Sequence, residues 1–216
     1  MFHGQGRKTA LLIANTYINS GIKELPTCRN DIDKIHELLT DKLNFKSENI
    51  IKKYDVYPEK ELNFFLKSIR KNDIVFIYFA GHGADLMGSV HVPASVGLMS
   101  SWINPDKTYF FSYYLDILLR NIQIECKIIL CSDSCYSGRF LNNYTGKNPI
   151  YFIGASDLDT KTASYSKDNT KYGALVLLFI YLLENNKDII FEDIFEKTLN
   201  FRKKEKILKY ITLIKK

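Results

Sequence analysis

The stretch Asp73–Gly83, with the sequence DIVFIYFAGHG, decides the fold of this chain more than any other part. Its first part, Asp73–Ala80, is a continuous run of β-branched and aromatic residues. A run of this kind is typical of a parallel strand that is covered on both faces. Gly81-His82-Gly83 follows directly, so a titratable imidazole stands where the predicted strand ends. We therefore expect a buried strand with a reactive group at its carboxyl end.

Similar apolar runs recur along the chain and alternate with segments of helical spacing. The predicted strands are Thr9–Ala14, Ile50–Val56, Asp73–Ala80, Cys126–Cys131 and Ile150–Gly154. The predicted helices are Asn30–Leu39, a segment that Pro58 opens, Tyr109–Ile122, Gly173–Leu183 and Ile189–Leu199. Asn30 or Asp31 is expected to cap the first helix. The tail, Lys206–Ile214, fits a strand or a helix equally well. The alternation predicts an α/β fold, a three-layer α/β/α sandwich with a mostly parallel central sheet.

Length and composition predict one globular domain. The chain has 216 residues, of which 46% are hydrophobic and 25% charged, and this is enough to bury a core. We expect a single domain over residues 1–216 with its core at about 8–200. The most apolar run, Ala174–Leu183, is much shorter than the roughly 20 residues that cross a bilayer. Met1–Lys8 lacks the apolar segment of a signal peptide. A cytoplasmic protein without a membrane partner is therefore expected.

The net charge of +6 permits an acidic partner but does not require one. The basic residues are spread along the chain and cluster only after Arg202, where they form either a solvated face or a contact patch. No RNA-binding signature is present, so nucleic acid is not an expected partner. The longest irregular stretch, roughly Gly83–Lys107, has the length of a functional loop.

The four cysteines do not form a pattern for disulfides or for zinc. Cys28, Cys126, Cys131 and Cys135 lack CxxC spacing, and no secretory signal accompanies them. They are expected to be reduced thiols. The other histidines, His3, His36 and His91, have no partner at metal-ligand spacing. No metal and no cofactor are therefore expected.

A second reactive residue follows another predicted strand. The segment Ser132–Gly138, SDSCYSG, comes directly after Cys126–Cys131 and contains Cys135. Because ligands bind beyond the carboxyl ends of parallel strands, His82 and Cys135 are expected at the same edge of the sheet. A thiolate is a strong nucleophile, and a nearby imidazole can take up and return protons. The sequence predicts a Cys-His dyad for amide hydrolysis, with the backbone N–H groups of Gly83 and Cys135 as the oxyanion hole.

Five segments carry a family resemblance. They are Lys8–Asn15 (KTALLIAN), Leu25–Asp31 (LPTCRND), Tyr78–Gly83 (YFAGHG), Asp133–Gly138 (DSCYSG) and Gly154-Ala155-Ser156. With these segments in this order, the chain resembles the caspase-like cysteine peptidases, in particular the metacaspase and paracaspase branches. The resemblance extends over about Lys8–Asn185. The roughly 50 residues expected between histidine and cysteine in the caspase arrangement also match.

The resemblance implies roles for four residues. His82 would be the general base and Cys135 the nucleophile. Asp31 and Asp133 stand where these branches place the acids that bind an Arg or Lys side chain before the cleaved bond. Paired carboxylates suit a buried guanidinium. The structural alternatives are a helix cap at Asp31 and a purely structural hydrogen-bonding role for Asp133. Arg29 lies near the region where true caspases bind a substrate aspartate.

The chain also differs from the metacaspase and paracaspase pattern in two segments. Ala163-Ser164-Tyr165 stands where many relatives carry an acid, and Pro93-Ala94-Ser95 replaces the usual Pro-x-Asp after the histidine loop. Because metacaspases are often activated by calcium, calcium remains open as an activator. Asp157 and Asp159 are either ligands for it or solvated turn residues.

These observations give one leading function and two alternatives. The leading hypothesis is a cysteine endopeptidase that cleaves protein or peptide substrates after Arg or Lys. The first alternative is a caspase-like interaction module that is catalytically silent or is activated by a regulatory protein partner. The second is a caspase-type peptidase that cleaves after Asp. A monomer and a homodimer both remain open.

Overall fold

The computed structural model describes residues 6–85, 100–141, 144–157, 161–162, 164–184, 193–204 and 212–216. Its strands are β1 (Lys8–Ala14), β2 (Ile50–Tyr54), β3 (Ile74–Ala80), β4 (Gly83–Asp85), β5 (Ser100–Ile103), β6 (Tyr109–Phe111), β7 (Lys127–Asp133), β8 (Ile150–Gly154), β9 (Ser164–Lys167), β10 (Thr170–Gly173) and β11 (Thr212–Lys215). Its α-helices are α1 (Thr27–Leu43), α2 (Pro58–Leu66), α3 (Ser112–Arg120), α4 (Ala174–Glu184) and α5 (Asp193–Lys204). Two short 3₁₀ helices, η1 (Ser47–Asn49) and η3 (Ser137–Arg139), complete the elements used below.

The central sheet has six strands in the order β11-β8-β7-β3-β1-β2. Five of them run parallel to one another, and β11 pairs with β8 in the antiparallel direction. The strand predicted from Asp73–Ala80 is β3, which lies between β1 and β7. Parallel strands need long crossover connections, and helices supply them here. The predicted mostly parallel sheet is thus confirmed.

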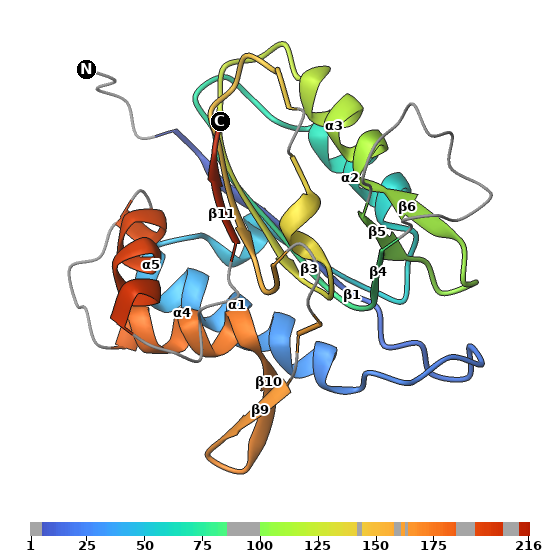
Figure 1. Cartoon of the computed structure of the whole chain (residues 1–216). Helices are drawn as coiled ribbons and strands as arrows, with labels where there is room; N and C mark the ends of the chain where they lie inside the picture. Colours follow the sequence, from blue (N-terminus) through green and yellow to red (C-terminus); the bar gives the residue numbers. More distant parts are fainter. Residues whose placement is uncertain are drawn as a thin grey trace.

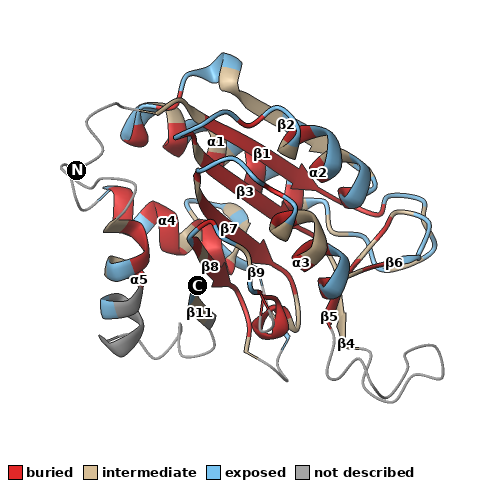
Figure 2. Cartoon of the chain, turned by 90° about the horizontal axis from the view of Figure 1, so that it is seen from above, coloured by how far each residue is buried: buried red, intermediate tan, exposed pale blue. Residues whose placement is uncertain are grey.

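Helices cover both faces of this sheet, which gives three layers (Figure 1). One apolar cluster joins α1 and α4 to one face, with Leu12 and Phe76 of the sheet among its members. The other joins α2 and α3 to the opposite face, with Leu11 and Ile77 among its members. Neighbouring residues of one strand thus face opposite layers, as the pleat requires. The strands are mostly buried in consequence, which explains why the sequence shows continuous apolar runs (Figure 2).

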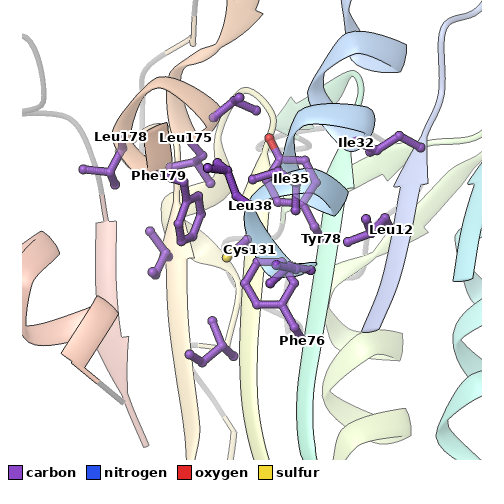
Figure 3. Packing of buried hydrophobic residues seen from close by; sticks show 14 of the residues in the cluster. Leu12, Ile32, Ile35, Leu38, Phe76, Tyr78, Cys131, Leu175, Leu178 and Phe179 are labelled. Carbon is purple, nitrogen blue, oxygen red and sulfur yellow. The ribbon is translucent and has the colours of Figure 1, made fainter. Parts of the chain in front are cut away.

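The layer of α1 and α4 packs directly over the middle of the sheet. In Figure 3, Ile35 and Leu38 from α1 and Phe179 from α4 lie over Phe76 of β3 and Cys131 of β7. The rings of Phe76 and Phe179 meet edge to face at 5.9 Å between centroids. This packing fixes the start of α4 near the carboxyl ends of β3 and β7, which later positions two acidic side chains.

Three sequence predictions about helices need correction. The first helix begins at Thr27, so Asp31 lies inside α1 and caps nothing; Asn30 is also inside it. The segment Tyr109–Ile122 is divided into the strand β6 and the shorter helix α3. The last predicted helix, Ile189–Leu199, continues beyond Leu199 as α5 (Asp193–Lys204), and its predicted first residues, 189–192, lie outside the described part of the chain. In the undecided tail, Thr212–Lys215 is the strand β11.

Two small sheets were not predicted. The stretch expected to be irregular, Gly83–Lys107, contains β4 and β5, which pair with each other and, through β5, with β6. Residues 86–99 of this stretch, with His91 and Pro93-Ala94-Ser95, lie outside the described residues. The second small sheet is the hairpin of β9 and β10, directly before α4. Both sheets lie at the end of the molecule that holds the candidate site (Figure 1).

Candidate active site

The carboxyl ends of β1, β3 and β7 lie level with one another. Ala14 pairs with Ala80, and Ala80 pairs with Asp133. The residues that follow these pairs therefore enter the same region beyond the sheet. His82 follows β3, and Cys135 follows β7. The sequence prediction that both lie at one edge of the sheet is supported by this register.

Gly83 brings the histidine segment into contact with the cysteine segment. A Cβ atom placed on Gly83 would lie 2.1 Å from the backbone oxygen of Cys135 and 3.0 Å from Oγ of Ser134. No side chain fits at that separation. Because Gly83 is bonded to His82, the backbone approach places His82 and Cys135 on adjoining loops. Only glycine allows this approach.

The imidazole of His82 is oriented by a backbone carbonyl. Its Nε2 lies 2.6 Å from the carbonyl oxygen of Lys23. A carbonyl oxygen only accepts, so Nε2 carries the proton of this hydrogen bond. In the neutral ring, Nδ1 is then left with its lone pair and can accept a proton. Lys23 thereby selects the tautomer in which Nδ1 is the base.

Cys135 is partly buried and has a sharp turn after it. Tyr136 has φ 57°, in the left-handed region. Burial raises the pKa of the Cys135 thiol, opposed by a backbone hydrogen bond from Thr162 and by the positive charge of Lys161, while the Asp133 charge raises it further. The resting residue is therefore a thiol rather than a thiolate. A nucleophile of this kind needs a base that removes its proton during the reaction.

Serine side chains hold the backbone on both sides of Cys135. Ser156, after β8, accepts a hydrogen bond from the Ser137 N–H at 2.9 Å and donates one to the Ser134 carbonyl at 3.0 Å. Ser100 of β5 donates to the Tyr136 carbonyl. The four serines of the network, Ser100, Ser134, Ser137 and Ser156, are fully buried, and Tyr136 is half-buried. The turn that carries Cys135 is thus fixed by side chains from two other strands.

A buried ion pair joins the two loops further from the sheet. The guanidinium of Arg139 in η3 lies 2.7 Å from the carboxylate of Asp85 in β4. Only 2% of the Arg139 side chain is exposed, and 22% of that of Asp85. Asp85 follows the histidine segment, and Arg139 follows the cysteine segment. The pair therefore links the same two segments that meet at Gly83.

The structure brings Asp31 and Asp133 close to each other at the start of α4. Oδ1 of Asp31 accepts a hydrogen bond from the Gly173 N–H at 2.8 Å. Oδ2 of Asp133 accepts from the Leu175 N–H at 3.0 Å and from the Tyr78 hydroxyl at 2.9 Å. Gly173 and Leu175 flank the first residue of α4, so Asp133 satisfies N–H groups at that helix end. The expected structural hydrogen bonds of Asp133 are therefore present.

Burial raises the pKa of both acids, and the charge of Asp133 raises that of Asp31 further. Asp31 and Asp133 are 2% and 5% exposed. Loss of water around the carboxyl groups is the main cause at each; the Asp133 charge adds to it at Asp31, and hydrogen bonds from Tyr78 and Leu175 oppose it at Asp133. Two like charges that share a dry site favour the protonated form. A cationic group placed beside them would stabilise both charged forms and lower both pKa values.

Several other predicted features can be placed. All four cysteines are free thiols, as expected. Asp157 is described, but Asp159 lies outside the described residues, so the proposed calcium pair stays a prediction. Within the described part of the chain, no group of three or more His, Cys, Asp or Glu residues could hold a metal ion. Nor does any helix of that part have the length and apolarity to span a membrane.

The family model for the metacaspase, peptidase C14 domain matches residues 8–144. The matched range is well over half of the chain and contains both His82 and Cys135. The chain belongs to the metacaspase peptidase C14 family. This confirms the sequence-based resemblance to caspase-like cysteine peptidases.

Individual relatives agree with this assignment. Metacaspase-7 of Arabidopsis thaliana is 26% identical over 145 residues, which covers 62% of this chain and 36% of the relative. Metacaspase-1 of Kluyveromyces lactis is 24% identical over 216 residues, which covers 85% of this chain and 48% of the relative. This metacaspase chain thus spans between about a third and a half of the length of these relatives.

A solved structure shares the fold. The crystal structure of a protein from Geobacter sulfurreducens superposes with a TM-score of 0.67 over 97% of the metacaspase chain and 92% of its own. The two sequences are 13% identical. At that identity the likeness concerns the arrangement of the elements alone, and it supports the three-layer architecture described above.

Sequence reasoning missed three residues that hold the site. Tyr17 and Asp55 contact the histidine side, and Arg139 joins the two loops. Their positions relative to His82 depend on which strands are neighbours, and one sequence does not reveal this. The only local signal is at Asp55, the last residue but one of the predicted strand Ile50–Val56, near the same edge of the sheet as His82.

Proposed function

We propose that this chain is a cysteine endopeptidase in which Cys135 is the nucleophile and His82 the general base. Membership of the metacaspase family supports the reaction type. The observation that carries the residue assignment is the close approach of Gly83 to the Cys135 backbone, because it puts the two reactive side chains on adjoining loops. The tautomer set by Lys23 leaves Nδ1 of His82 free to act as the base.

The reaction proceeds by acylation and deacylation. The Sγ atom of Cys135 attacks the carbonyl carbon of the scissile bond, and its proton passes to Nδ1 of His82. The backbone N–H groups of Gly83 and Cys135 donate to the oxyanion that forms. His82 then returns the proton to the leaving amine, which gives a thioester. A water molecule, deprotonated by His82, hydrolyses the thioester and restores the thiol.

We also propose that Asp31 and Asp133 bind the side chain of Arg or Lys before the cleaved bond. Each carboxylate is buried and has a raised pKa, so the site favours a cation that neutralises both. Arg29 supports the caspase-type alternative less well, because its guanidinium lies 3.4 Å from the Asp55 carboxylate and over the ring of Tyr54. A basic substrate therefore fits this region better than an acidic one.

Cleavage of a peptide panel tests the proposal. Fluorogenic peptides ending in Arg, Lys or Asp are incubated with the wild-type chain and with Cys135→Ala, each with and without calcium. We expect cleavage after Arg or Lys in the wild type and a loss of about 10⁴-fold or more in Cys135→Ala. Cleavage only after Asp would overturn the role of Asp31 and Asp133.

Thiol labelling separates an inactive enzyme from a binding module. At neutral pH, iodoacetamide should alkylate Cys135 much faster than Cys28, Cys126 and Cys131, which are buried. Mass spectrometry of the labelled peptides gives the four rates. Equal, slow labelling of all four cysteines, together with no cleavage in any condition, would favour an interaction module that uses the fold without the chemistry.

A further inference from the structure

Tyr17 lies directly against the histidine of the proposed dyad. The centroids of the Tyr17 and His82 rings are 4.7 Å apart, with the planes tilted by 45°. The Tyr17 hydroxyl accepts a hydrogen bond from the backbone N–H of His82 at 3.0 Å. Only 1% of Tyr17 is exposed, so water does not compete for this hydroxyl. A single side chain therefore contacts both the ring and the backbone of His82.

Ile103 of β5 completes this arrangement. Its carbonyl oxygen accepts a hydrogen bond from the Tyr17 hydroxyl at 2.7 Å, and its N–H donates to the His82 carbonyl at 3.1 Å. Burial raises the pKa of Tyr17 far above its usual range, so the hydroxyl keeps the proton that it donates. The backbone N–H and the carbonyl of His82 are thus both held, one by Tyr17 and the other by Ile103.

Asp55 holds Tyr17 in the backbone conformation that these contacts need. Tyr17 has φ 60°, in the left-handed region that residues other than glycine rarely adopt. The Asp55 carboxylate accepts hydrogen bonds from the N–H groups of Thr16 and Tyr17, at 2.6 and 3.2 Å, and from the Thr16 hydroxyl at 2.8 Å. Asp55 directly follows β2, so a different part of the sheet fixes this turn.

Tyr17 also anchors the loop that orients the imidazole. Its carbonyl accepts hydrogen bonds from the Ser20 N–H at 3.1 Å and the Ser20 hydroxyl at 2.7 Å. The same loop continues to Lys23, whose carbonyl accepts the hydrogen bond from Nε2 of His82. The place of the Lys23 carbonyl, and with it the tautomer of His82, therefore depends on the turn at Tyr17.

We propose that Tyr17 is a positioning residue for His82 and that Asp55 fixes Tyr17 in that role. The inference rests on the proposed function, in which Nδ1 of His82 accepts the proton of Cys135. Tyr17 acts on the base through its backbone, its ring and the Lys23 loop, and it has no part in binding the basic side chain of the substrate. Its loss should therefore lower kcat and leave KM nearly unchanged.

Removal of the Tyr17 hydroxyl is the first test. Tyr17→Phe keeps the ring and deletes both hydrogen bonds. With an Arg-ending peptide we expect kcat to fall about 10-fold or more and KM to stay within about 2-fold. The matched control is Tyr57→Phe, which deletes an exposed hydroxyl that donates to Asp106. Equal kcat values in both folded variants and the wild type would contradict the proposal.

Two changes at Asp55 test the second half of the inference. Asp55→Ala removes every acceptor from the Tyr17 turn and should lower kcat as far as Tyr17→Phe does. Asp55→Asn keeps one oxygen at the same position and should recover part of that loss. If Asp55→Ala is folded and fully active, Asp55 has no positioning role. If Tyr17→Phe does not fold, Asp55→Asn still answers the question, because its loss must again appear in kcat and not in KM.

A measurement without substrate separates this inference from the proposed function. ¹⁵N NMR of histidine-labelled protein reports the ring tautomer of His82, whose signals are those that disappear in His82→Gln. We expect one tautomer, with the proton on Nε2, in the wild type and in Tyr57→Phe. Tyr17→Phe and Asp55→Ala should show a mixture of tautomers. If the tautomer changes in Tyr17→Phe but the wild type cleaves no peptide, the peptidase function is refuted and the positioning role of Tyr17 stands. Unchanged His82 signals in folded Tyr17→Phe would overturn the positioning role.

Discussion

The two halves of the candidate active site are held by different kinds of interaction. On one side, neutral groups hold His82: the Tyr17 hydroxyl, the Lys23 carbonyl and the backbone of Ile103. On the other side, two carboxylates, Asp31 and Asp133, are buried within reach of each other's charge. The histidine side is satisfied within the free protein. The acid side holds two carboxyl groups whose charged forms a cationic substrate would stabilise.

The difference has a physical reason. A base must be held in one orientation, and hydrogen bonds to fixed neutral groups do this with no net charge to bury. A pocket for a cation must keep its carboxylates away from water, and this raises their pKa until the cation arrives. The hydrogen bonds that Asp133 accepts from Tyr78 and Leu175 reduce this cost only in part, since its pKa remains raised. The carboxyl groups of the free protein therefore have raised pKa values, and a bound cation would stabilise their charged forms.

The largest effect is expected when the acid side loses one ionisable group. Asp31→Asn keeps an oxygen that can accept from the Gly173 N–H, but it cannot become negatively charged beside a bound cation. For a peptide ending in Arg, kcat/KM should fall about 10³-fold, the usual cost of removing one partner of a buried charged contact. Most of the loss should lie in KM, because the base at His82 is unaffected. Steady-state kinetics against the Arg peptide measure both constants.

The matched control for this variant lies two residues further along the same helix. Asp33 is exposed on α1 and pairs with Lys52 at 2.7 Å. Asp33→Asn should leave kcat/KM within about 2-fold of the wild type, because an exposed ion pair contributes little. Equal activity of the wild type, Asp31→Asn and Asp33→Asn would break the comparison, since the acid side would then have no part in substrate binding.

The sheet could be predicted from the sequence because its strands are buried on both faces. Continuous apolar runs such as Asp73–Ala80 leave little choice of structure. The hairpin of β9 and β10 was missed because its strand residues are mostly polar and none of them is buried. A signal was present, however, in Asp168-Asn169 between Tyr165 and Tyr172. Both turn residues have positive φ, 48° and 63°, and Asp and Asn favour that conformation in two-residue hairpins.

The reactive residues of the site could be predicted, but the contacts that hold them could not. His82 and Cys135 each follow a recognisable strand, and short motifs mark them. Tyr17 stands in a polar stretch after β1, and its role depends on β1 being the neighbour of β3. Arg139 pairs with Asp85 across 54 positions of sequence. Such pairings arise from the order of strands in the sheet, which strand patterns alone do not determine.

The charged pair of Arg139 and Asp85, which links the histidine and cysteine segments, is expected to support the fold, in contrast to the two acids of the acid side. Arg139→Met keeps an unbranched apolar stem but removes the guanidinium that pairs with the Asp85 carboxylate. Breaking a buried ion pair in this way should lower the free energy of unfolding by about 3 kcal/mol. Urea denaturation measures the change. Lys52→Met, which breaks the exposed pair with Asp33, should cost less than about 1 kcal/mol. A loss below about 1 kcal/mol in Arg139→Met as well would mean that the buried pair contributes no more to the fold than an exposed one.

The smallest effect is expected in the pH dependence of stability, and it tests whether the acid side destabilises the free protein. Burial and the charge of Asp133 raise the pKa of Asp31 to about 8, so the folded chain binds this proton more tightly than the unfolded chain, where an aspartate has a pKa near 4. The stability that this proton contributes is present below about pH 4 and is lost as the pH rises through 8. Because asparagine does not ionise, Asp31→Asn does not lose this stability as the pH rises.

The free energy of unfolding of Asp31→Asn should therefore match that of the wild type near pH 4 and exceed it by at least about 2 kcal/mol near pH 8. Asp33→Asn should change in the opposite direction, because hydrogen bonds from Lys52 and Tyr54 outweigh burial and lower the pKa of Asp33. Urea denaturation of the three proteins at both pH values decides the matter. If Asp31→Asn is no more stable than the wild type at pH 8, ionisation of Asp31 does not destabilise the folded chain. The contrast with the satisfied histidine side would then rest on substrate binding alone.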